Sequence, residues 1–323
     1  MASDSLKHPG ILPSDPFAEA GRKVLRFHFN RMLQHETGSR IGYDIEELHD
    51  MRVATRRMRA AFDVFFEAYR PKIIKRYVKG LGNTGKALGR VRDYDVLIDN
   101  TQKYLTSDDN SLRDFLGILI DAWFVEREFA RIKMLKYLDG RKYAVFKKNF
   151  GKFVDSPGEG VSKYLNKQVV LVKDIAPELI LACVDDVKAF KESVTEPDVD
   201  QLHTLRIKFK KLRYTLEFFR EILSPEADDV IKDLKRVQDH LGNLHDNDVA
   251  RKKIRRFTKD WEDQYPKPSK KKQERIEPVY VFLKARNKEL THLIDTFPDV
   301  WNFYQRSAFQ ENLRKAISIR DFQ

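Results

Sequence analysis

Cysteine is almost absent from this 323-residue sequence, which contains only Cys183. A single cysteine excludes a framework of intramolecular disulfides and a cysteine-based zinc site. Cys183 lies within the apolar segment LILACV, residues 179–184. We therefore expect it to be a small core residue in a protein of a reducing compartment.

Long apolar runs are also missing. The most apolar window, residues 115–125, contains Asp121 and is too short to span a bilayer. The first ten residues, MASDSLKHPG, are polar and lack the apolar centre of a signal peptide. These features predict a cytoplasmic protein that does not bind membranes.

Glycine and proline are scarce as well, at 14 and 12 residues, whereas charged residues make up 34% of the chain. Few helix breakers and many Lys, Glu, Arg and Leu favour long helices over strands. The hydrophobic fraction of 41% is large enough for a real core, which excludes a disordered basic chain. The net charge of +12 indicates a polyanionic partner or an acidic surface.

A basic segment occurs twice in the chain. LHDMRVATRRMR, residues 48–59, returns as LHTLRIKFKKLR at residues 202–213. LGRVRDYDV, residues 88–96, similarly returns as LGNLHDNDV at residues 241–249. Asp44 and Asp198 stand at matching positions upstream, each three residues before Glu47 or Gln201, in the spacing of a capping box. We predict an internal duplication, because a period of about 150 residues suits two duplicated units better than a solenoid.

The periodicity predicts an all-α fold of two antiparallel helical bundles, with about four helices each. We expect a disordered leader at 1–16, a first bundle at 17–158 and a second at 159–323, because DSPGEG at 155–160 is the clearest break. In the first half we expect helices at 15–34, 44–69, 72–88, 93 to about 107, 111–138 and 141–153. A loop at 37–42 and a C-terminal cap at Gly89 complete the prediction. In the second half, breaks are expected at 195–197, 224–225 and 266–272.

The repeated segment forms a basic ridge on a helical wheel. In the first copy the charged side chains fall within about 80° of one another, separate from an apolar face, and the ridge is about 15 Å long. The first ridge contains His49, Arg52, Arg56 and Arg59 over about three turns, with Asp63 next on the same arc, and the second contains His203, Arg206, Lys210 and Arg213. A solvated surface would also carry charges, but such faces usually mix signs, since like charges four residues apart repel. The single sign of both ridges therefore favours an anion-binding function.

The doubled His-x-x-Arg segment, together with the LG-x-x-x-D-x-DV segments, resembles the CHAD domain, the conserved histidine α-helical domain. The resemblance extends from about residue 17 to residue 322. It implies two bundles related by a pseudo-twofold axis, a basic groove between them, and binding of inorganic polyphosphate. Carried onto this sequence, the implied groove residues are His49, Arg52, Arg56, Arg57, Arg59, His203, Arg206, Lys210, Lys211 and Arg213. Arg26, Lys86, Arg90 and Arg92 are weaker candidates, because they lie in or beside helices expected to flank the ridges.

The second copy departs from the first by having Lys210 and Lys211 in place of arginines. Lysine keeps the charge but lacks the planar fork that binds phosphate in a bidentate manner, so the halves are not expected to contribute equally. No ExExK signature of a triphosphate tunnel domain is present, which indicates a stand-alone CHAD protein.

Linear polyphosphate has no bases, so its binder needs positive charge and hydrogen-bond donors but no stacking surface. The ridges contain few aromatic residues, which favours a phosphate chain over single-stranded nucleic acid. Affinity is expected to fall steeply with salt. Neighbouring arginines and the helix N-termini disfavour protonation of His49 and His203, so a bound anion should cause proton uptake.

Two alternatives remain open at this point. A helical RNA- or DNA-binding protein would also be basic, and residues 251–256, RKKIRR, could form a patch, although no nucleic-acid motif is present. A metal-dependent phosphohydrolase is suggested by the His-Asp pairs at 49–50 and 245–246, but no set of convergent ligands accompanies them. The acidic pairs Asp93/Asp95 and Asp246/Asp248 are expected to cap helices or to hold arginines. We therefore expect no catalysis, cofactor or metal, and location in the cytoplasm with polyphosphate granules; oligomeric state stays open.

Overall fold

The fold is all-α, as the sequence predicts. The computed structural model describes residues 8–107, 116–165, 167–192, 194 and 196–320. Within these ranges the regular structure is helical, and β pairing is limited to three isolated bridges. No helix in the described part of the chain is both long enough and apolar enough to cross a membrane.

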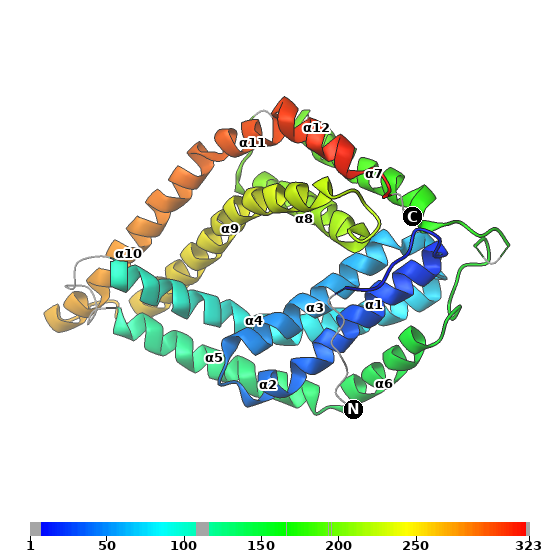
Figure 1. Ribbon diagram of the computed structural model, residues 1–323. Helices are drawn as coiled ribbons and strands as arrows, with labels where there is room; N and C mark the ends of the chain where they lie inside the picture. Colours follow the sequence, from blue (N-terminus) through cyan, green and yellow to red (C-terminus); the bar gives the residue numbers. More distant parts are fainter. Residues whose placement is uncertain (1–7, 108–115, 166, 193, 195, 321–323) are drawn as a thin grey trace.

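The helices follow one another in two successive groups (Figure 1). The first group consists of α1 (Phe17–Gln34), α2 (Glu36–Ile41), α3 (Ile45–Val64), the 3₁₀ turn η1 (Phe66–Ala68), α4 (Pro71–Ser107), α5 (Gly117–Leu138) and α6 (Arg141–Asp155). The second consists of α7 (Val172–Glu192), α8 (Val199–Phe219), α9 (Glu226–Gln264), α10 (Lys270–Asp295), α11 (Phe297–Gln305) and α12 (Ser307–Ala316). Three parts of the predicted segments lie outside the described residues: 1–7 of the leader, 111–115 of the helix predicted at 111–138, and 195 of the break predicted at 195–197.

Helix α4 is one continuous helix of 37 residues, so the predicted end at Gly89 is wrong. Gly89 is instead buried inside α4, where an added Cβ would lie 3.3 Å from Nε of Arg52. Gly242 has the matching place in α9, and its Cβ would lie 3.9 Å from Nη2 of Arg206. Gly89 thus lets the Arg52 guanidinium approach the helix backbone closely, whereas at Gly242 a Cβ would make only an ordinary van der Waals contact. The close packing at Gly89 looks like a helix end in sequence. The internal duplication as such stays a prediction.

The predicted loop at 37–42 is also wrong, because α2 occupies residues 36–41. Its buried residue Glu36 accepts hydrogen bonds from Tyr143 at 2.9 Å and from Lys147 at 2.9 Å, both on α6. Gly42 ends the short helix with a φ of 79°, a left-handed conformation that favours glycine. Tertiary contacts of Glu36 therefore stabilise a helix whose sequence reads as a turn.

The predicted disordered leader is wrong for residues 8–16. Ile11 is buried, and the backbone N–H groups of Gly10 and Ile11 donate to the Glu221 carboxylate at 3.0 and 3.1 Å. Lys23 of α1 binds Asp15 at 2.7 Å. This segment connects the start of the chain to the second helical group, which its polar sequence does not indicate.

The two predicted helix starts differ in detail. At α8 the full capping box is present: Gln201 N–H donates to Asp198 at 2.8 Å, and Asp198 N–H donates to the Gln201 side chain at 2.9 Å. At α3, Asp44 accepts from Glu46 N–H at 2.8 Å. Glu47 bonds to His35 instead of closing a box, because α2 brings His35 within 2.9 Å.

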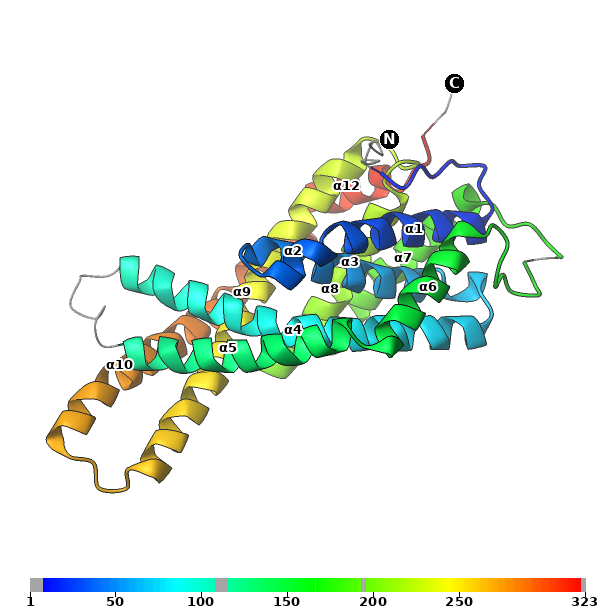
Figure 2. The same cartoon turned by 90° about the horizontal axis from the view of Figure 1, so that it is seen from below.

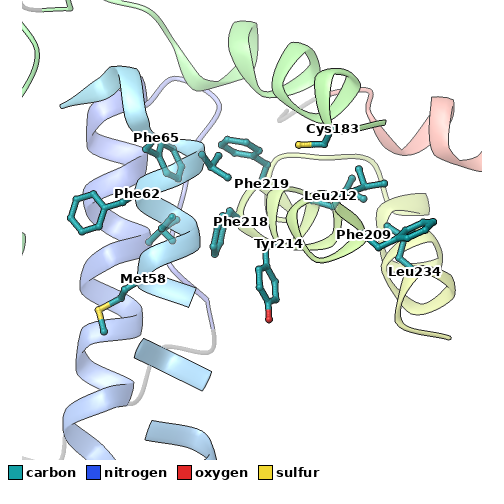
Figure 3. Packing of buried hydrophobic residues seen from close by; sticks show 14 of the residues in the cluster. Met58, Phe62, Phe65, Cys183, Phe209, Leu212, Tyr214, Phe218, Phe219 and Leu234 are labelled. Carbon is teal, nitrogen blue, oxygen red and sulfur yellow. The ribbon is translucent and has the colours of Figure 1, made fainter. Parts of the chain in front are cut away.

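One continuous hydrophobic core joins the two helical groups (Figure 3). Phe65, directly after α3, is fully buried and lies 4.9 Å from Phe17, 6.5 Å from Phe218 and 5.5 Å from Phe219, measured between ring centroids. Cys183 is buried in the same core beside Thr215, which confirms its predicted position. The boundary proposed at 158–159 stays a prediction.

A second, smaller core lies where α4 and α5 meet α9 and α10 (Figures 1 and 2). It contains Leu97 of α4, Trp123 of α5, Ile254 of α9 and Phe282 of α10, all buried. The two helical groups are thus in contact at two places, around Phe65 and at this far end. The long helices α4 and α9 run between the two contacts (Figure 1).

Replacing Phe65 by alanine should lower the free energy of unfolding by about 3–5 kcal/mol, because it opens a cavity where the two groups meet. Its neighbour Phe66 is 52% exposed, so the matched Phe66→Ala variant should change it by less than about 0.5 kcal/mol. Urea denaturation followed by circular dichroism measures both. Equal effects of the two substitutions would contradict the described core.

Candidate functional site

The two predicted ridges meet where α3 contacts α8. The guanidinium carbons of Arg56 and Arg57 on α3 lie 5.8 and 5.7 Å from the centroid of the Tyr214 ring on α8. Arg213 lies 5.3 Å from the same ring. Tyr214 is buried, and cations over an aromatic face are attracted by its quadrupole. This ring therefore holds arginines of both repeat copies together.

Four cationic side chains beside this contact, Arg52, Arg56, Arg206 and Lys210, form what we call the central basic cluster. Burial, together with the charges of Arg206, Arg56 and Arg52, lowers the pKa of Lys210 to about 7, and Asp246 opposes this lowering. Burial is also the largest cause of the lowered pKa of Arg206, to which Arg56 and Arg52 add. Cations from α3 and α8 thus share one poorly hydrated region, and each disfavours the charge of the others.

Members of the central basic cluster have few counter-charges. Arg52 lies 4.0 Å from Asp93, at the limit of an ion pair. Within the described residues no carboxylate forms an ion pair with Arg56, Arg206 or Lys210. Asp246 opposes the lowering of the pKa of Arg206 and of Lys210, but burial raises its own pKa. The cluster therefore keeps an excess of positive charge that an external anion can neutralise.

Histidines flank the cluster. The pKa of His49 is lowered by burial and by Arg92, and that of His203 by burial and by Arg206. The sequence predicted this direction, although burial rather than the neighbouring charges is the largest cause. The His203 ring stacks on that of His245 at 4.5 Å, and burial lowers the pKa of His245 to about 4. His245 occupies the repeat position of Arg92. Each ridge histidine therefore lies near a residue of the neighbouring long helix: His49 near Arg92 of α4, and His203 near His245 of α9.

The acidic pairs separate into two roles. Asp93 and Asp246 face the cluster, whereas Asp95 binds Arg127 at 2.5 Å and Asp248 binds Arg251 and Lys252 at 2.7 Å. Their predicted role as helix caps is wrong, because α4 and α9 are continuous there. The predicted ion pairing with groove arginines is confirmed for Asp93, which lies 4.0 Å from Arg52, whereas Asp95 and Asp248 pair with arginines outside the predicted groove.

Several other predicted residues are already engaged. Arg57 and Arg213 both bind Glu217, at 2.8 and 3.3 Å, so their charges are partly neutralised. Lys211 is exposed and lies 3.3 Å from Asp186. Arg92 binds Glu46 at 3.3 Å beside His49. The remaining candidates are exposed: Arg59, Lys86, Arg90 and Arg26, the last lying 3.2 Å from Asp155.

Sequence reasoning missed Tyr214 and misread His245. Tyr214 follows the second ridge directly and reads as a core residue, because nothing in the sequence shows that arginines from α3 reach it. His245 was attributed to a His-Asp pair, whereas its geometry shows a stacking partner for His203. Across the described ranges no three His, Cys, Asp or Glu side chains are grouped so as to hold a metal ion.

Lys210 should titrate near pH 7 in the ligand-free protein, and the signals of its Cε methylene measure this by NMR with labelled lysine. Arg56→Gln removes one cause of the lowering, so it should raise the pKa of Lys210. Arg59→Gln, an exposed change on the same helix, should leave the midpoint in place. A midpoint near that of ordinary lysine would contradict the buried cationic cluster.

Comparison with known proteins agrees with this architecture. The sequence model of the CHAD domain matches residues 23–255. The CHAD domain from the plant Ricinus communis has a similar structure, with a TM-score of 0.71, 21% identity and 99% coverage of both chains. PptA from Streptomyces chartreusis is also similar, with a TM-score of 0.68 and 14% identity over 89% of this chain and all of PptA. No curated protein matches the sequence.

The two structures share the fold at identities too low to transfer individual residues. The family match is independent of them and includes both ridges, from His49 to Arg59 and from His203 to Arg213. Together with the all-α architecture, this match shows that the chain belongs to the CHAD domain family.

Proposed function

We propose that this protein binds inorganic polyphosphate at the central basic cluster and catalyses no reaction there. One observation carries the proposal: Arg52, Arg56, Arg206 and Lys210 come together from two helices, partly buried and with little counter-charge. Placing like charges in a poorly hydrated region disfavours the unliganded state. A polyanion supplies the missing charge, and the CHAD resemblance implies polyphosphate as that anion.

The chemistry of the cluster suits a phosphate chain. Three arginines offer planar forks for phosphate oxygens, and Lys210 adds a point charge. The aromatic ring at the cluster, Tyr214, is buried under arginines and is therefore not available for stacking on a base. Binding is thus expected to depend on charge and on the spacing of the hydrogen-bond donors. A linear chain of identical phosphates presents the same acceptors to these donors wherever along its length it binds.

A nucleic acid remains the second candidate, for a specific reason. The α9–α10 hairpin extends away from the cluster (Figure 2) and carries the predicted basic patch at residues 251–256. Arg255, Arg256 and Lys259 are exposed on it. If RNA were the main ligand, this hairpin rather than the central basic cluster would dominate its binding.

Reversing two charges of the cluster, with Arg52→Glu and Arg206→Glu together, should weaken polyphosphate binding at least about 100-fold. Two charge-assisted hydrogen bonds contribute about 1.5–3 kcal/mol each, and about 1.4 kcal/mol corresponds to a tenfold change. The milder pair Arg52→Gln and Arg206→Gln should show a smaller loss in the same direction. Calorimetric titration with long-chain polyphosphate at fixed salt measures the affinity.

The matched control is Arg256→Glu with Lys259→Glu, which changes the net charge equally on the hairpin. It should leave polyphosphate affinity nearly unchanged. Competition among polyphosphate, RNA and heparin, repeated at several salt concentrations, identifies the preferred ligand. Binding should fall steeply with salt, and the cluster variant should reduce the logarithmic slope by roughly 1.4, by analogy with single-stranded nucleic acid. An intact affinity in the cluster variant would refute this site.

Proton uptake should accompany polyphosphate binding. The unliganded pKa of Lys210 is about 7 and those of His49 and His203 are lowered, so these groups are only partly protonated at neutral pH. A bound anion favours their charged forms and raises these pKa values, so affinity should rise as pH falls through 7. Calorimetry in buffers of different ionisation enthalpy measures the uptake, and Lys210→Arg should reduce it. A binding enthalpy independent of buffer would contradict this coupling.

A further inference from the structure

A cavity of about 610 Å³ lies between α4, α9 and α10, next to the central basic cluster. Arg92 of α4 and Asp246 of α9 line it at the end that adjoins the cluster. Its other end is lined by Tyr104 of α4 together with Phe282 and Arg286 of α10. This volume is within the range of pockets that hold small organic ligands.

The lining of the cavity differs from the cluster in charge. Among the described residues, six charged side chains line the cavity and balance: Arg92, Lys103 and Arg286 against Asp99, Asp246 and Glu289. The rest of the wall mixes apolar side chains, among them Leu97 and Phe282, with uncharged polar ones. A phosphate chain gains little from such a neutral lining, whereas an uncharged organic group with polar edges fits it. The two regions therefore suit the two ends of one amphiphilic anion.

Asn247 gives the cavity a specific polar group. Its side chain is 7% exposed and lines the cavity, and its Oδ1 has no hydrogen-bond partner. A buried acceptor without a partner is costly, and a ligand donor would satisfy it. Because Oδ1 is shielded from solvent in this state, a ligand donor reaches it only after the amide turns about its last bond, which exchanges Oδ1 and Nδ2. Asn243, one helical turn earlier on α9, lines the same cavity.

Arg286 of α10 adds a planar guanidinium to the lining of the same cavity. Its guanidinium carbon lies 5.2 Å from the Tyr104 ring centroid and 5.3 Å from that of Phe282. Its Nε has no hydrogen-bond partner. A guanidinium plane held on aromatic rings is a surface on which nucleobases stack. Asparagine amides pair in bidentate fashion with the N6 and N7 positions of adenine.

We propose that this cavity is a nucleoside site, which binds the adenine of an adenosine polyphosphate such as ATP while the phosphate tail lies on Arg92 and the central basic cluster. The phosphate part of this inference rests on the proposed function. The adenine part rests on Asn247, Arg286 and the balanced charge of the cavity. The protein would thereby distinguish a nucleotide from an inorganic chain with the same number of phosphates.

The test compares ATP with inorganic tripolyphosphate, which has three phosphates but no nucleoside. ATP should bind at least about tenfold more tightly by calorimetry, corresponding to about 1.4 kcal/mol, and CTP should bind more weakly than ATP. Asn247→Leu removes the amide at nearly constant volume, and Ala250→Phe fills the cavity from α9. Both variants should reduce ATP affinity to that of tripolyphosphate and leave the tripolyphosphate affinity itself unchanged.

Thermal unfolding of each variant with and without tripolyphosphate verifies that it is folded and that the cluster is intact. If ATP and tripolyphosphate bind the natural protein equally, the nucleoside site is refuted while the proposed function stands. An advantage of ATP that survives both substitutions also refutes it. If neither tripolyphosphate nor long-chain polyphosphate binds, the proposed function itself fails, so the two failures are distinguishable.

Discussion

The apolar contact between α3 and α8 is the interaction on which the rest of the structure depends. Phe65 contacts the rings of Phe218 and Phe219 and so joins the two helical groups in one apolar core. Directly along the same helices, arginines and a lysine gather although their charges repel. Hydrophobic burial, which is insensitive to charge, supplies the free energy that holds these cations together. The core is therefore the condition for the basic cluster.

Local pairing then divides the cations by role. Glu217 takes Arg57 and Arg213 as ion-pair partners close to the apolar contact, and Tyr214 covers the same region with its ring. Within the described residues Arg56, Arg206 and Lys210 lack such partners, and burial with the neighbouring positive charges lowers the pKa of Lys210 to about 7. The Glu217 carboxylate thus separates the arginines that stabilise the contact between α3 and α8 from those that remain unpaired and can bind an anion. The two kinds of arginine are adjacent in the sequence, where nothing distinguishes them.

The long helices α4 and α9 extend the site beyond the ridges. They bring Arg92 and His245 beside the ridge histidines and continue into the second core at α5 and α10. The cavity between α4, α9 and α10 opens from this continuation. Its lining is neutral where the cluster is basic, because Asp99, Asp246 and Glu289 offset its three cations. A single pair of helices consequently connects two regions of different chemistry.

The sequence by itself determined the helical class, the capped start of α8, and the single sign of both ridges, since these follow from periodicity and local side-chain chemistry. It could not show that Gly89 continues a helix, that Glu36 stabilises one, or that residues 8–16 are packed. Each of these depends on a partner distant in the chain: Arg52, Tyr143 and Glu221. The tertiary structure also decided which arginines of α3 keep their charge unpaired, because the ion pair of Arg57 with Glu217 requires α3 and α8 to meet. Charge pattern is a property of the sequence, whereas counter-charge and burial are properties of the fold.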